Sequence, residues 1–421
     1  MRLDWRPKAP RLFFGWWLVA ACFFIALYTG GVIFYGFTAV FEPVADEFHW
    51  SYAQISFAAS LRGIESGLLV PVTGILVDRW GPRRLVLSGA LVVAGGLLLL
   101  SRTDSLGMFY GAFALLAVGM SLASPTVLMT SVVNWFRKRV GTATGILACG
   151  YGFGGLLIPL IIDMIDRYDW RTAMLILALG MLAVGLPLSF VVRHKPEAYG
   201  YLPDGEEYRS PLSGGQSAAP TTAELHVPAR DALRSRTFWH IALALVCQTL
   251  CLGAVVTHVM PYLSSVGIAR ATAGLVASGI PLVSIAGRLG LGWLGDRVDK
   301  RKVAALAFAI LGAGLLCFGF TSRAQAWLLV PFLVLFGIGY GGNAALCPAL
   351  VREFFGRGSF GAIHGFVMGV MMVGAVLGPL LAGKVFDDCG SYQTIWLVFS
   401  GFAAAAVFLV ASTPSVGVVR E

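Results

Sequence analysis

Arg288 lies in the middle of a long apolar run, with no acidic residue within one helical turn of it. An arginine at bilayer depth costs roughly 2.5–3.5 kcal/mol or more unless it faces a cavity and finds a partner. A guanidinium forms two parallel hydrogen bonds with a planar carboxylate, so this position favours binding of an organic anion. The alternative is an arginine that pairs with another helix for structural reasons.

Other polar side chains also lie in apolar stretches and need hydrogen-bond partners away from lipid. They are either substrate contacts or hydrogen-bonding groups between helices. This set consists of Tyr28, Tyr35, Tyr151, Tyr340 and Asn343.

Three further groups suit gating or proton coupling. Arg62 and Glu65 share one helix face, either as an internal ion pair or as a gate or proton relay in which Glu65 accepts the proton. Histidines titrate near neutral pH, which makes His258 a candidate for coupling, with packing as the alternative. For His364, close to two glycines, we expect packing or gating.

The seven cysteines form no metal-ligand pattern, and we interpret them as small packing residues. No expected helix contains a nucleophile–base pair or a metal cluster. The sequence therefore argues against an enzyme and predicts neither a cofactor nor a metal site.

The chain of 421 residues is 57% hydrophobic and only 13% charged. Soluble domains contain about 25% charged residues, so lipid must solvate much of this surface. The net charge of +9 comes from basic residues divided among short loops, which argues against nucleic acid and indicates a cytoplasmic membrane face.

Twelve apolar stretches are long enough to cross about 30 Å of hydrocarbon as helices, which predicts an all-α membrane protein. The basic N-terminus leads into a long apolar run without a cleavage site, so the first helix is expected to remain as a span. The spans are expected at 15–40, 54–77, 84–101, 107–133, 140–162, 171–192, 237–262, 271–294, 303–321, 325–349, 360–385 and 392–412.

Loop charge sets the orientation of the spans. Of 31 Lys and Arg residues, 23 lie in segments on the side of the N-terminus and 6 on the opposite side, which places both termini in the cytoplasm. Residues 193–236 form a long hydrophilic stretch, expected to be a cytoplasmic linker. We therefore predict a multi-pass protein of the cell inner (plasma) membrane.

The two halves of the chain repeat each other. Parallel repeats predict two six-helix bundles, 1–192 and 237–421, joined by the linker 193–236. Small residues four positions apart predict surfaces on which the bundles slide; these are Gly141 and Gly145, and Gly361, Gly365 and Gly369. The run Gly74-Ile-Leu-Val-Asp78-Arg79-Trp-Gly81-Pro-Arg83-Arg84 recurs 218 residues later as Gly292-Trp-Leu-Gly-Asp296-Arg297-Val-Asp-Lys-Arg-Lys.

Asp78, Arg79, Asp296 and Arg297 lie at the cytoplasmic ends of expected helices, where charges pair across loops and with helix dipoles. We expect them to hold an outward-open state. Topology alone would explain the arginines but not the repeated aspartates.

The repeated run, between spans two and three, resembles the signature of the major facilitator superfamily, and the resemblance covers the whole chain. Finer features are similar to the monocarboxylate transporter and oxalate:formate antiporter branch. They are Tyr35-Gly-Phe-Thr-Ala-Val-Phe41, Gly287-Arg288-Leu-Gly-Leu-Gly-Trp-Leu-Gly-Asp296-Arg297 and Lys195-Pro-Glu-Ala-Tyr-Gly-Tyr-Leu-Pro-Asp-Gly205.

This resemblance implies a major facilitator fold with a cavity lined by spans one, four, seven and ten, and so makes Tyr35, Tyr340 and Asn343 candidate substrate contacts. Related carboxylate carriers use a span-eight arginine, here Arg288, for the substrate carboxylate. Proton-coupled members have an aspartate one turn earlier, where this chain has Ser284, and a lysine near the position of Tyr35. The oxalate carrier has a second basic residue in span eleven, so the single cation here favours a monoanion.

The sequence therefore predicts a secondary transporter of a small organic anion, a monocarboxylate, working by alternating access with proton symport or anion exchange. The expected partners are this anion, protons or a counter-anion, and the lipid bilayer, with the protein as a monomer. An exporter of hydrophobic drug-like compounds has the same fold, but Arg288 argues against it. An anion-binding membrane sensor is an alternative from another class, and the short linker argues against it.

The predicted orientation can be tested at Ser213. In a background without native cysteines, a cysteine introduced by Ser213→Cys is expected to react with a membrane-impermeant maleimide only in opened cells. Asp104→Cys, in an expected outer loop, is the control that should react in intact cells. Strong labelling of the Ser213→Cys variant in intact cells would contradict the predicted topology.

Overall fold

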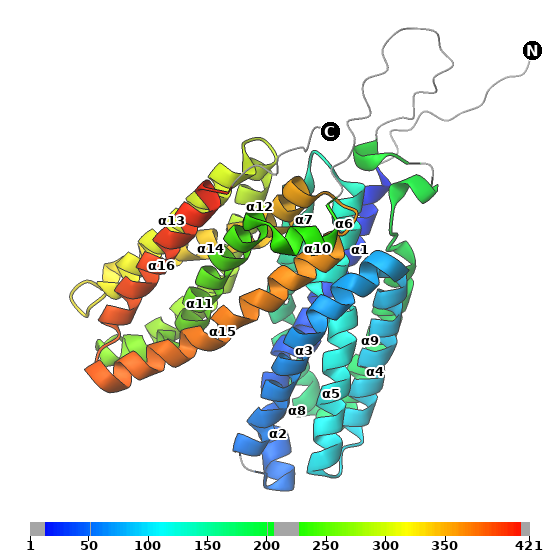
Figure 1. Ribbon diagram of the computed structural model, residues 1–421. Coiled ribbons are helices and arrows are strands. Elements are labelled where there is room, and N and C mark those ends of the chain that lie inside the picture. The colour runs from blue at the N-terminus through cyan, green and yellow to red at the C-terminus, as the bar shows by residue number, and fades with distance from the viewer. Residues whose placement is uncertain (1–12, 51, 200, 206–226, 414–421) are drawn as a thin grey trace, which may run out of the picture.

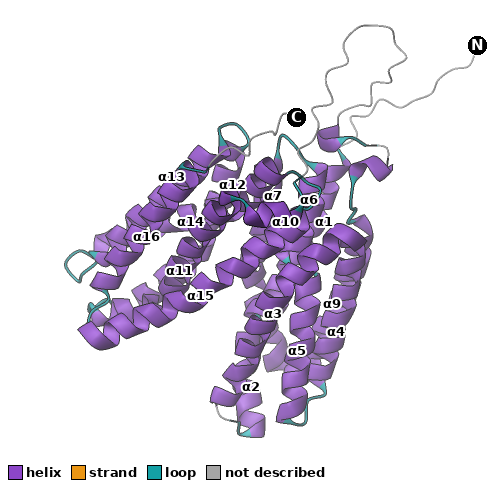
Figure 2. Cartoon of the chain, viewed as in Figure 1, coloured by secondary structure: helices purple, strands orange, loops and turns teal. Residues whose placement is uncertain are grey.

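The computed structural model describes residues 13–50, 52–199, 201–205 and 227–413 (Figure 1). Every regular element in these ranges is a helix (Figure 2), which confirms the predicted all-α class. Eleven spans in this part of the chain are long and apolar enough to cross a membrane. The remaining expected span, 54–77, lies within α3, a helix of 29 residues.

The first six spans contain the helices α1 to α9. Three of the spans consist of more than one element, because the first, fourth and fifth change their helical geometry along their length. The elements are α1 (Phe14–Thr29), η1 (Gly30–Tyr35), α2 (Phe37–Phe48), α3 (Tyr52–Trp80), α4 (Pro82–Ser101), α5 (Leu106–Leu122), α6 (Pro125–Trp135), α7 (Val140–Phe153), η2 (Gly154–Leu157), α8 (Ile158–Tyr168) and α9 (Trp170–Val191).

The last six spans are more regular. They follow two short turns, η3 (Pro196–Tyr199) and η4 (Pro203–Gly205), and the surface helix α10 (Ala229–Arg234). Their elements are α11 (Arg236–Ser265), α12 (Arg270–Gly295), α13 (Lys300–Gly319), η5 (Ala326–Leu328), α14 (Leu329–Phe355), α15 (Phe360–Cys389) and α16 (Gln393–Ala411).

Local signals explain several helix starts. Pro82 and Pro125 occupy the first turn of α4 and α6, where the missing amide hydrogen costs no helical hydrogen bond. Ser105 and Ser235 cap α5 and α11 by accepting hydrogen bonds from the backbone amides three residues further on. The spans therefore begin close to the positions that the sequence predicted.

Two groups of helices, α1–α9 and α11–α16, meet at the end of the molecule that contains α10 and diverge toward the other end (Figure 1). We call the end where they meet the closed end. Residues 70–78 of α3 pack there on residues 361–369 of α15, and residues 141–152 of α7 pack on residues 288–296 of α12. The domain limits at 192 and 237 stay a prediction.

The predicted glycine faces lie at this contact between the groups. A side chain on Gly145 would overlap the carbonyl oxygen of Arg288, and a Cβ on Gly365 would lie 2.9 Å from the carbonyl oxygen of Val70. Small residues thus let the two backbones approach closely, as in other membrane helix pairs.

Glycine also sets the distance between α11 and α15 within the second group. A Cβ on Gly378 would overlap the carbonyl oxygen of Leu250, so Gly378→Ala is expected to lower the thermal unfolding temperature in detergent. Gly401→Ala is the control, because no neighbouring atom would lie within 4 Å and alanine favours a helix by about 1 kcal/mol. Equal unfolding temperatures for the two variants would contradict this close packing.

Candidate functional site

Arg288 lies on α12 at the boundary between the two groups, with 6% of its surface exposed. Its Nη1 donates a hydrogen bond of 2.7 Å to the carbonyl oxygen of Ala148 on α7. Its Nε has no hydrogen-bond partner among the described residues. The guanidinium is thus buried between the groups with a donor still unused.

Small residues on α7 make room for this guanidinium. A Cβ on Gly152 would lie 2.8 Å from Nη1 of Arg288. On the arginine's own helix, Ser284 is fully buried and its hydroxyl donates to the carbonyl of Pro281 at 2.6 Å. The Ser284 hydroxyl therefore donates to its own helix rather than to a neighbouring one.

Tyr340 on α14 brings an aromatic ring to this region, and Asn343 follows it by three residues on the same helix. The Cζ atom of Arg288 lies 5.7 Å from the centroid of the Tyr340 ring, within reach of a cation–π interaction. Asn343 is 2% exposed, and its Nδ2 has no hydrogen-bond partner within the described chain. A second donor is therefore buried without a partner, one turn of α14 from Tyr340.

Gln248 on α11 was not predicted as a site residue. It is buried, and its Nε2 donates to the carbonyl oxygen of Tyr340 at 3.3 Å. It thus links α11 to the backbone next to the tyrosine ring. The available signal was a lone amide within a predicted apolar span, since such groups are rarely left without a role in membrane helices.

The other predicted tyrosines point elsewhere or cannot be placed. The hydroxyl of Tyr28 donates to the carbonyl of Leu177 on α9 at 2.7 Å, inside the first group. Tyr151 packs against Gly30 of η1, and its buried hydroxyl has no partner among the described residues. The side chain of Tyr35 lies outside the described residues.

The backbone is irregular at two adjacent places near Arg288. The π-helical turn η1 in span one packs against the 3₁₀ turn η2 in span five, which begins two residues after Gly152. A Cβ on Gly154 would lie 2.6 Å from the amide nitrogen of Gly31. Irregular helical turns within a membrane protein often mark functional sites. Hydropathy could not predict them, although the pairs Gly30-Gly31 and Gly154-Gly155 were a local signal.

The predicted coupling residues lie in three separate places. Arg62 and Glu65 lie on α3, but their side chains are outside the described residues. His258 on α11 lies 3.1 Å from the hydroxyl of Tyr392 and 3.0 Å from the carbonyl oxygen of Pro379, through its two ring nitrogens. His258 is ten residues, about 15 Å, along α11 from Gln248, so the structure separates it from Arg288.

Two aspartates join the groups at the closed end. Asp78, at the end of α3, accepts hydrogen bonds from the amides of Gly361 at 2.9 Å and Ala362 at 2.8 Å, at the start of α15. Asp296, directly after α12, accepts from the amides of Gly141 at 2.7 Å and Thr142 at 2.8 Å, at the start of α7. Each carboxylate therefore caps a helix of the opposite group.

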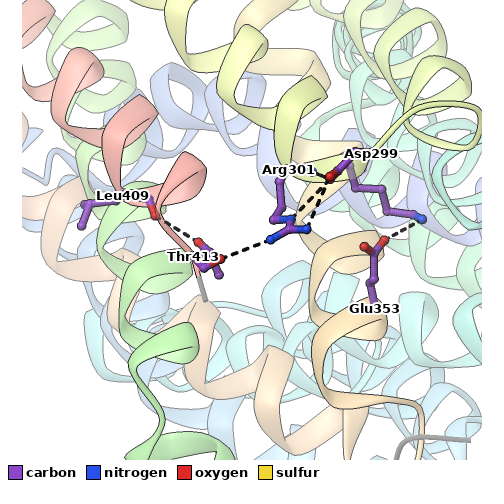
Figure 3. Close-up of polar contacts among 6 residues, drawn as sticks. Asp299, Arg301, Glu353, Leu409 and Thr413 are labelled. Atoms are coloured by element: carbon purple, nitrogen blue, oxygen red, sulfur yellow. Dashed lines mark hydrogen bonds and ion pairs between the residues drawn. The ribbon is translucent and has the colours of Figure 1, made fainter. Parts of the chain in front are cut away.

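Arg297 and Arg301 contact residues of their own group. Arg297 stacks on the Trp293 ring at 3.9 Å, and Arg79 is exposed. Figure 3 shows Arg301 with Asp299 and the carbonyl oxygen of Thr413.

His364 lies between the groups, with Nδ1 3.1 Å from the hydroxyl of Thr126. No group of three or more His, Cys, Asp or Glu residues in the described ranges is placed to hold a metal ion.

The sequence and the fold both match known transporters. A sequence model described as Major Facilitator Superfamily matches residues 12–269 and 255–417. Monocarboxylate transporter 12 of Xenopus laevis is 28% identical over 404 residues, which cover 92% of this chain and 86% of that protein. Monocarboxylate transporter 13 of Bos taurus is 26% identical over 425 residues, which cover 98% of this chain and 92% of that protein.

Solved structures share the fold at low identity. The fucose:proton symporter FucP of E. coli has a TM-score of 0.71 and 14% identity, over 96% of this chain and 100% of that chain. The human organic anion transporter MFSD10 has a TM-score of 0.66 and 14% identity, over 96% of this chain and 100% of that chain. The relatives are transporters rather than enzymes, and the family model spans nearly the whole sequence, so this chain belongs to the major facilitator superfamily of membrane transporters.

Proposed function

We propose that this chain is a secondary transporter of a small organic monocarboxylate, which Arg288 binds between the two groups of helices. The observation that most supports this proposal is the buried guanidinium whose Nε lacks a partner among the described residues. A buried donor without a partner costs about 1–3 kcal/mol, and more when it is charged. A bound carboxylate would supply the missing acceptor and the opposite charge.

The surroundings of Arg288 are consistent with a small ligand that has one charged end. Tyr340 offers an aromatic face, and Asn343 offers a second buried donor. The names of the relatives point to the same substrate class, since they are monocarboxylate transporters. Tyr35 remains a proposed contact from span one.

We propose further that the closed end faces the cytoplasm of a plasma membrane, so that the described conformation is outward-open. The excess of Lys and Arg in the loops at this end supports this orientation. Substrate would enter from outside and reach Arg288, and the closed end would then have to open for release. In this proposal the protein works as a monomer.

Coupling to protons or to a second anion distinguishes two versions of this mechanism. Glu65, Arg62 and His258 are the proposed coupling residues for proton symport. A proton gradient should then drive accumulation of the acid in proteoliposomes that contain no internal anion. In anion exchange, uptake should instead require an anion inside the vesicles.

The caps formed by Asp78 and Asp296 give the first prediction for this function. Asp78→Asn weakens the cap on α15, so we expect slower uptake with ligand affinity within about twofold of the parent's. Asp299→Asn is a matched control, because Asp299 caps α13 within its own group by accepting from the Arg301 amide at 2.9 Å. Loss of ligand binding by folded Asp78→Asn protein would contradict a gating role.

The second prediction concerns Arg288 itself. Removing one partner of a buried charge pair typically costs about 2–5 kcal/mol, or roughly 30- to 3000-fold in affinity. Arg288→Ala should therefore abolish measurable carboxylate uptake in proteoliposomes. Arg288→Lys should recover only part of it, because an ammonium keeps the charge but loses the planar fork.

The neighbouring residue provides the control for this series. Leu289 is 42% exposed, so Leu289→Ala should insert normally and transport like the parent. Affinity and uptake are compared at equal protein levels, and carboxylate binding is also followed by thermal shift. Arg288→Ala protein that binds and transports like the parent would overturn the carboxylate proposal.

A further inference from the structure

The segment after α9 lies on the closed end and has no part in the proposed binding site. We call residues 193–199 and 201–205 the strap. It includes η3 and η4 and contains most of the Lys195–Gly205 motif. Its side chains contact both groups of helices.

Aromatic contacts fix the start and the middle of the strap to the first group of helices. The guanidinium of Arg193 lies 4.0 Å from the centroid of the Phe14 ring and 4.2 Å from that of Tyr199. The Tyr201 ring lies 5.8 Å from the Trp135 ring at the end of α6. Such cation–π and ring contacts are favourable, so they hold this part of the strap against the first group.

Asp204 fixes the end of the strap. Its Oδ2 accepts hydrogen bonds from the amide of Arg137 at 3.1 Å and from that of Lys138 at 2.8 Å, in the loop before α7. Asp204 has a positive φ of 61°, a conformation that aspartate tolerates better than most residues. The strap is therefore anchored at three places on the first group.

An ion pair between described residues connects the anchored strap to the second group. Glu197 in η3 pairs with Arg357, which lies in the loop between α14 and α15. The two side chains are 38% and 20% exposed. Burial lowers the pKa of the neighbouring His194 imidazole to about 4, so this ring adds no charge next to Arg357 at neutral pH.

We propose that the strap is a clasp on the closed end, and that the pair between Glu197 and Arg357 holds the two groups together there. This inference rests on the proposed alternation between open and closed ends. The pair must break when the groups separate at this end, so its energy favours the described conformation alone. Anchoring Glu197 in η3 lowers the entropy cost that weakens most surface ion pairs.

The chain offers a closely matched control pair. Lys300 and Glu353 form an ion pair of 2.8 Å, with side chains 21% and 39% exposed, but both residues belong to the second group. Figure 3 shows the Glu353 carboxylate beside Arg301 and Asp299. Breaking this pair removes a similar interaction without affecting the contact between the groups.

The test measures the opening of the closed end without any substrate. Spin labels are attached at Arg84→Cys and Lys302→Cys, two exposed and equivalent positions of the repeat, with exposed Cys389 replaced by serine. The distance between the two labels is measured by double electron–electron resonance spectroscopy, with the protein in lipid nanodiscs. Because no ligand is needed, the result stands even if the carboxylate proposal fails in the Arg288 series.

Glu197→Gln and Arg357→Gln should each raise the ratio of separated to closed protein by about two- to fivefold, as expected for one partly exposed ion pair. Glu353→Gln should leave the ratio unchanged. Combining Glu197→Arg with Arg357→Glu should return it toward the parent's value. No change in either single variant, or an equal change in Glu353→Gln protein, would overturn the clasp.

A reversible cross-link supplies a second measurement. In Glu197→Cys/Arg357→Cys protein, a bis-maleimide with an internal disulfide replaces the ion pair, because the two long side chains leave their backbones too far apart for a direct disulfide. Cross-linking should stop transport, and cleaving the linker with a reductant should restore it. Cross-linked protein that transports like the parent would also overturn the proposal.

Discussion

Two aspartates, each accepting two backbone hydrogen bonds from a helix of the opposite group, determine how the halves of this transporter meet. Asp78 caps α15 and Asp296 caps α7. A carboxylate at a helix N-terminus gains from charge-assisted hydrogen bonds and from the helix dipole. The close glycine contacts of α3 with α15 and of α7 with α12 lie directly beside these caps, and the groups diverge toward the other end (Figure 1).

The candidate binding residue lies on the same contact between the groups. Arg288 precedes Asp296 by eight residues, or about 12 Å along α12, and both residues contact α7. An anion that draws the guanidinium away from the Ala148 carbonyl would therefore change the same helix pair that the cap holds. The proposed binding residue and the proposed gating residue therefore act on one helix pair, α7 and α12.

The two halves are similar at the closed end but differ near Arg288. The caps occur in both copies of the repeat, whereas the position equivalent to Arg288 in the first half is Val70. Spans one and five contain the irregular turns η1 and η2, while the corresponding α11 and α15 are continuous helices of 30 residues each. The caps at the closed end are thus common to both halves, whereas Arg288 and the irregular turns each occur in one half only among the described residues.

Much of the architecture could be predicted from the sequence alone. The membrane spans follow from hydropathy, and their starts from proline and serine, because these signals act within a few neighbouring residues. The repeat indicated the importance of Asp78 and Asp296, and the cost of a charge in hydrocarbon indicated Arg288. None of these inferences required knowledge of which helices touch.

Only the tertiary structure decided which partner each polar group has. The capping of α15 by Asp78 joins residues 283 positions apart, and the bond from Arg288 to Ala148 joins residues 140 positions apart. The turn of Tyr28 toward α9, the role of Gln248 and the anchoring of the strap likewise depend on how each helix is rotated about its axis. Hydropathy constrains that rotation weakly in a membrane protein, since lipid and neighbouring helices are similarly apolar, and close packing between distant segments determines it instead.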